Sequence, residues 1–84
     1  MSFENSWSKI LQNEGKNFKT ITGLDFSYSI EGDILIPSRT DYNISKSEFQ
    51  KAFDMLPIKG PGEINNIVRG PAYVWAILND SKIK

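Results

Sequence analysis

The sequence contains no cysteine and no histidine. Disulfide bonds, thiolate nucleophiles, imidazole bases and the common zinc sites are therefore excluded. A chain of 84 residues without these devices must be held by its apolar core, so we expect one small domain, residues 1–84, with a stability of about 5 kcal/mol. The absence of cysteine fits a reducing compartment, and the N-terminus lacks the apolar run of a secretory leader, so we expect a cytoplasmic protein.

Charge of one sign and long apolar runs are lacking as well. Ten basic residues balance ten acidic ones, so no net field draws the protein to nucleic acid or to a membrane. The longest apolar run, residues 72–78, is far shorter than a membrane span. Eleven isoleucines stand against two valines, and eight lysines against two arginines. This bias is typical of AT-rich genomes and favours an origin in a bacterium, a phage or a mobile element.

The common catalytic and nucleotide-binding motifs are missing too: the sequence has no G-x-S-x-G, no P-loop and no G-x-G-x-x-G. Residues 59–62, Lys-Gly-Pro-Gly, resemble a phosphate loop only superficially, because Pro61 has no amide hydrogen to donate. Asp25 and Asp33 are expected on the wet face of paired strands, and together with Asp41 they lack a recognisable ligand spacing. We expect no catalytic residues, no cofactor and no metal.

The first half of the chain predicts one helix and three strands. Apolar residues at i, i+4, i+7 and i+8 favour a helix over residues 3–14, with Gly15 at a left-handed C-cap. Residues 24–30 alternate between apolar and polar side chains, which predicts a strand with Leu24, Phe26 and Tyr28 facing the core. A turn at 31–32 returns the chain along 33–36, and residues 18–22 are expected as the third strand.

The second half predicts helices. Ser45 and Glu48 match a capping box at the start of a helix that runs to Leu56, before Pro57. A short helix is expected over 61–69. The segment 72–79 is apolar on all sides, so periodicity leaves helix and buried strand open, with helix favoured by Pro71 at the first position.

The resulting order is α-β-β-β-α-α-α. It predicts an α+β fold in which a small three-stranded antiparallel sheet is packed by an N-terminal helix and two or three C-terminal helices.

Polar residues gather between the predicted hairpin and the capped helix. A helix N-terminus attracts anions, and Arg, Tyr, Thr and Asn supply a planar cation, hydroxyls and an amide beside it. The second arginine precedes Gly70-Pro71. The ordinary alternative is a connecting loop with an Arg39–Asp41 ion pair, and an arginine that only complements a helix dipole. The candidate binding residues are Arg39, Thr40, Tyr42, Asn43, Lys46 and Arg69.

These features predict a non-enzymatic binding module that contacts nucleic acid or another anionic partner. The alternative is a protein–protein adaptor or inhibitor that acts through a sheet edge or surface aromatics. Most aromatic side chains fall on predicted core faces, and residues 73–78 offer almost no polar groups to read bases, so a helix-turn-helix is disfavoured. Steep salt dependence of binding would favour the first function, and aromatic hot spots the second.

Overall fold

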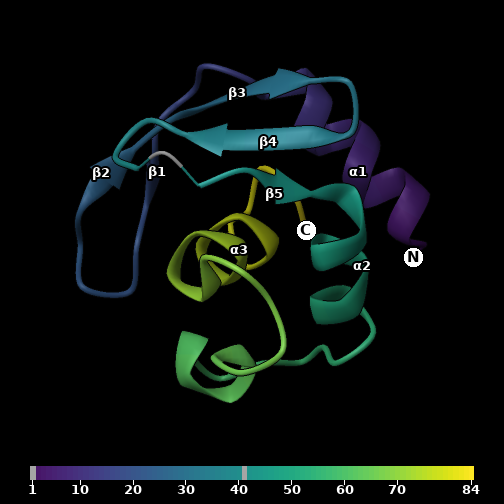
Figure 1. Cartoon of the computed structure of the whole chain (residues 1–84), viewed down its shortest axis with the longest axis vertical. Coiled ribbons are helices and arrows are strands. Elements are labelled where there is room, and N and C mark those ends of the chain that lie inside the picture. The colour runs from purple at the N-terminus through teal and green to yellow at the C-terminus, as the bar shows by residue number, and fades with distance from the viewer. Residues whose placement is uncertain (1, 41) are drawn as a thin grey trace.

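The computed structural model describes residues 2–40 and 42–84. It confirms the predicted α+β class: in Figure 1 the C-terminal helices lie below the strands, and the N-terminal helix lies beside them. The elements in chain order are α1 (Phe3–Gln12), β1 (Phe18–Lys19), β2 (Asp25–Phe26), β3 (Tyr28–Glu31), β4 (Ile34–Pro37), β5 (Ile44–Ser45), α2 (Lys46–Phe53), the 3-10 helix η1 (Pro61–Ile64) and α3 (Pro71–Leu78).

The three-stranded sheet has the order β3-β4-β5 and is antiparallel throughout. The strand expected over 18–22 is not its third member; β1 pairs with β2 in a separate two-stranded ladder, and β5 completes the larger sheet. The expected strand 24–30 is divided at Ser27, whose amide donates to the Ser38 hydroxyl rather than to a strand backbone (3.0 Å). Leu24 lies near the tip of the small hairpin and is 49% exposed, so the inward position predicted for it is wrong.

The segment 72–79, for which periodicity left helix and buried strand open, is mostly helical and forms α3. Gly70 has a left-handed backbone (φ +60°) and precedes Pro71 at the first helical position, so the chain turns sharply into a helix. In Figure 1, α3 lies between the sheet and η1, beside α2. Its central position explains why Val74 and Ile77 are fully buried. A helix surrounded by other elements needs apolar residues on most of its faces, as this one has.

Helix α1 packs against the strands through a buried polar contact. The Tyr28 hydroxyl donates a 2.6 Å hydrogen bond to the Ile10 carbonyl. Burial raises the pKa of the Tyr28 hydroxyl well above its ordinary value, so this group stays protonated and able to donate. The helix ends at Gln12, earlier than predicted, and Gly15 lies beyond it with φ +85° and donates its amide to the Tyr28 carbonyl (3.0 Å).

The capping box predicted for α2 is wrong. Ser45 occupies the N-cap but its side chain makes no capping hydrogen bond; its hydroxyl lies 2.8 Å from the Ser47 hydroxyl instead. Ser45 also belongs to β5, where it pairs with Ile34. The helix is shorter than predicted and ends at Phe53.

Two residues predicted to be buried are exposed: Leu11 (42%) and Ile67 (39%). Ile67 was expected on the inner face of a helix over 61–69, but regular structure there stops at Ile64 and the following residues form turns. Among the described residues, no helix is long and apolar enough to cross a membrane.

Candidate binding surface around Tyr42 and Arg69

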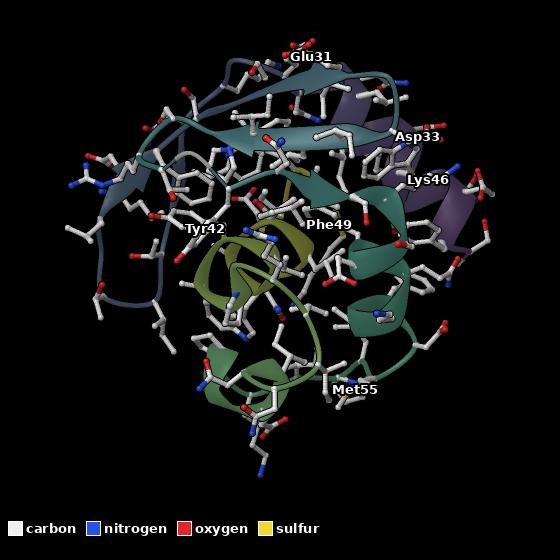
Figure 2. All side chains as sticks on the ribbon, viewed as in Figure 1. Glu31, Asp33, Tyr42, Lys46, Phe49 and Met55 are labelled. Carbon is white, nitrogen blue, oxygen red and sulfur yellow. The ribbon has the colours of Figure 1, made fainter. Side chains whose placement is uncertain are left out.

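The six residues predicted as a binding site do not converge on one place. They separate into a pair formed by Tyr42 and Arg69, an isolated Lys46 on α2, and Arg39 over β2. Figure 2 shows Tyr42 on one side of α3 and Lys46 at the far end of α2 beside Asp33, with Phe49 between them. The segment 38–47 therefore does not form a single continuous surface.

Tyr42 and Arg69 come together from distant parts of the chain. The Arg69 guanidinium carbon lies 5.6 Å from the centroid of the Tyr42 ring, a cation–π arrangement. Both side chains are exposed, Tyr42 to 44%. A Cβ at Gly70 would lie 2.9 Å from Ile44 Cδ1 and 3.4 Å from Tyr42 Cδ2. The absence of a side chain at Gly70 thus leaves room for Ile44, while the Tyr42 ring lies at ordinary van der Waals distance from this position.

Glu48 of α2 fixes the backbone beneath this pair. Its carboxylate accepts a 2.9 Å hydrogen bond from the Arg69 amide and forms a 2.9 Å ion pair with the Lys51 ammonium. The hydrogen bond from Lys51, followed by that from the Arg69 backbone, lowers the pKa of the Glu48 carboxyl. Sequence reasoning assigned Glu48 to a local cap, and nothing in the local pattern indicated a partner 21 positions away.

The Arg69 guanidinium makes no hydrogen bond or ion pair to another residue in the described part of the chain. Within residues 2–40 and 42–84, no carboxylate lies within 4.0 Å of it; the recorded ion pairs are those of Lys19, Lys46, Lys51 and Lys82. A guanidinium presents five N–H donors in a planar fork that matches carboxylate or phosphate oxygens. The pair can therefore offer a charged fork and an aromatic surface at the same place.

Lys46 is engaged elsewhere. Its ammonium lies 3.4 Å from a Glu4 carboxylate oxygen and 5.8 Å from the centroid of the Trp7 ring. Its amide donates to the Asp33 carbonyl (2.7 Å). Lys46, Glu4 and Asp33 are among the residues that line a surface depression of about 420 Å³ at the start of α2. The ion pair with Glu4 and the acidic Asp33 nearby make this helix N-terminus less favourable for an anion than the sequence suggested.

The remaining predicted residues have local roles. Arg39 donates from Nη1 to the Asp25 carbonyl (3.3 Å), and the Thr40 hydroxyl accepts from the Tyr42 amide (3.4 Å). Asn43 is exposed. The Arg39–Asp41 ion pair considered as an ordinary alternative involves Asp41, which lies outside the described residues.

Asp25 and Asp33, both expected on the wet face of paired strands, have different surroundings. Asp25 on β2 is held by the Lys19 ammonium (2.9 Å) and the Asn17 amide (3.2 Å), and these hydrogen bonds lower the pKa of its carboxyl. Asp33 borders the depression at α2 instead. Among the described residues, no three acidic groups gather where they could hold a metal ion.

Comparison of the chain with protein-family models, with curated proteins and with solved structures gives no match. A function must therefore be inferred from the exposed Tyr42–Arg69 pair and from the hydrogen bond that Glu48 accepts from the Arg69 amide.

Proposed function

We propose that this protein is a non-enzymatic binding module and that the Tyr42–Arg69 pair is the centre of its contact surface. The observation that carries the proposal is the exposed guanidinium stacked 5.6 Å from an exposed tyrosine ring. Tyr and Arg are the side chains most often responsible for binding energy at macromolecular interfaces, because each combines a flat apolar surface with hydrogen-bonding groups.

The partner class we favour is single-stranded nucleic acid. A guanidinium binds phosphate oxygens through its fork, and tyrosine and guanidinium planes both stack on bases. Asn43 is exposed on the same segment as Tyr42 and offers an amide for additional hydrogen bonds. The zero net charge argues against tight, non-specific binding, so we expect modest affinity that falls as the salt concentration rises.

A protein partner is the second candidate, and exposed apolar groups favour it. Tyr42 (44% exposed) and Ile67 (39% exposed) supply surface that a partner could cover. The sheet-edge form of this hypothesis has less support, because the free side of β3 is already occupied. There the Tyr28 carbonyl accepts from the Gly15 amide (3.0 Å), and the Ile30 amide donates to the Glu14 carboxylate (2.8 Å).

Titration with labelled oligonucleotides tests the proposal. Single-stranded DNA and RNA of about 12 nucleotides and a matched duplex would be followed by fluorescence anisotropy at about 50 and about 200 mM salt. We expect saturable binding of the single strands that weakens with salt. Absence of binding to single strands at the lower salt concentration would rule out this partner class and favour the protein partner.

We further propose a cytoplasmic setting in a bacterium, a phage or a mobile element. The absence of cysteine and the isoleucine and lysine bias support this assignment.

A further inference from the structure

A second depression, of about 300 Å³, lies where the three α-helices meet. Its wall is mainly apolar: Phe53 and Leu56 come from the end of α2 and the residues after it, and Leu78 comes from α3. None of the residues assigned above to the Tyr42–Arg69 surface lines this pocket. Phe53 and Leu56 are only partly buried, so an apolar molecule placed here would cover surface that the fold leaves in contact with water.

One polar group of the wall is available to a ligand. Ser6 of α1 lines the pocket and is only 5% exposed. Its hydroxyl has no hydrogen-bond partner among the described residues. No fully buried side-chain oxygen or nitrogen in the described part of the chain lacks a partner, so the Ser6 oxygen keeps some accessible surface, and the pocket is the depression that Ser6 lines. A hydroxyl can donate one hydrogen bond and accept others.

The other polar groups of the wall are already engaged or lie at its rim. The Asn79 amide group donates to the Trp75 carbonyl (3.0 Å). Lys84 is exposed, and its main-chain oxygen accepts from the Lys9 ammonium (3.2 Å). The only charged side chain among the lining residues is that of Lys84, which is exposed, and an exposed ion pair contributes little. A charge buried in the apolar part would stay unpaired, which is strongly unfavourable.

We propose that this pocket binds a small uncharged molecule that has an apolar body and one hydroxyl or carbonyl group hydrogen-bonded to Ser6. The volume of about 300 Å³ is at the lower end of the range for ligand sites, so we expect a small ligand rather than a long acyl chain. This site is independent of the macromolecular binding proposed above.

Benzyl alcohol and toluene are matched probes, because they share the ring and its attached carbon and differ only by the hydroxyl group. Each would be titrated into the isotope-labelled protein and followed by amide chemical shifts. We expect saturable shifts for residues of the pocket wall, including Phe53, Leu78 and Asn79, and tighter binding of the alcohol. Ser6→Ala should weaken binding of benzyl alcohol about two- to tenfold, the effect of one hydrogen bond, and leave toluene binding unchanged.

Toluene also reports on the fold of the variant. Alanine is a good helix former and the Ser6 hydroxyl holds no partner, so the helix should persist. Unsaturable shifts, shifts centred away from this wall, or equal affinity of parent and variant for the alcohol would overturn the proposal. Equal weakening of both probes by Ser6→Ala would also overturn it, because the hydroxyl would then have no specific role.

Discussion

The Arg69 amide donates a 2.9 Å hydrogen bond to the Glu48 carboxylate and so ties the turn before α3 to helix α2. This contact lies directly beneath the Tyr42–Arg69 pair. The same carboxylate receives the Lys51 ammonium, so one side chain of α2 organises both the backbone and part of the charge around the proposed binding surface.

Neutralising Glu48 should make stability less dependent on pH. The pKa of its carboxyl is below the ordinary value of 4.5 in the folded protein, so its charge stabilises the fold above that pH, and this contribution is lost as pH falls through the folded pKa. We expect Glu48→Gln to cost about 1 kcal/mol at pH 7.

Urea melts of the parent and Glu48→Gln, near neutral pH and near pH 3, provide the measurement. The difference in unfolding free energy should shrink at the lower pH, because the stabilisation that the Glu48 charge gives the parent is lost as pH falls towards its lowered pKa. A difference of the same size at both values would mean that the charge of Glu48 contributes nothing.

The two serines at helix N-caps should differ in importance. Ser2 accepts the Asn5 amide at 3.3 Å at the start of α1, whereas Ser45 makes no capping hydrogen bond to α2. Ser2→Ala should therefore cost about 0.5–1 kcal/mol, and Ser45→Ala less than that. Thermal or urea melts decide the order, and a larger loss for Ser45→Ala would restore the capping box inferred from the sequence.

Gly70→Ala should destabilise the protein more than Gly15→Ala. Both glycines have positive φ, but a Cβ at Gly15 meets no atom within 4 Å, whereas at Gly70 it would lie 2.9 Å from Ile44 Cδ1. Gly15→Ala thus reports backbone strain alone, about 1 kcal/mol, and Gly70→Ala adds crowding of the core, for a total of roughly 2–3 kcal/mol. Equal losses of unfolding free energy in urea melts would show that Ile44 can move aside at little cost and would contradict this prediction.

Tyr28→Phe should cost about 1 kcal/mol, since it removes a buried hydrogen bond to the Ile10 carbonyl and leaves the ring in place. Its urea midpoint compared with that of Tyr73→Phe is the check. Tyr73 packs edge to face on Phe26 at 5.0 Å between centroids and has no recorded hydroxyl hydrogen bond within the described residues. A smaller loss for Tyr28→Phe than for this control would contradict the assigned role.

The helices could be predicted from the sequence where neighbouring residues determine their start or their buried face. Pro71 after Gly70 starts α3, and the spacing of Phe3, Trp7 and Ile10 defines the buried face of α1. Those signals act over one or two turns. Helix boundaries were less accurate, because α2 begins at the end of a strand and Ser45 serves both elements.

The pairing of the strands and the geometry of the candidate site could not be predicted from local sequence. Alternation shows which residues can face inward, but it does not say that β5 is the third strand of the larger sheet while β1 and β2 form a separate ladder, since that choice depends on contacts across the whole fold. Tyr42 and Arg69 were both candidates from the sequence, yet local patterns do not show that the fold brings them together or that the Arg69 amide donates to Glu48. Lys46 was selected on a cap motif and is instead paired with Glu4.

The central claim, that the Tyr42–Arg69 pair is the binding surface, is tested most directly by the salt dependence of single-strand binding in Arg69→Gln. The matched control is Lys16→Gln, which removes one exposed positive charge from the loop between α1 and β1. Affinities measured at several salt concentrations should show Arg69→Gln weaker than the parent, with a slope of log affinity against log salt shallower by about 0.7, the value for one phosphate contact. Lys16→Gln should retain the parent slope. An Arg69→Gln protein that binds with the parent's affinity and slope, or a Lys16→Gln protein that loses as much, would contradict the claim.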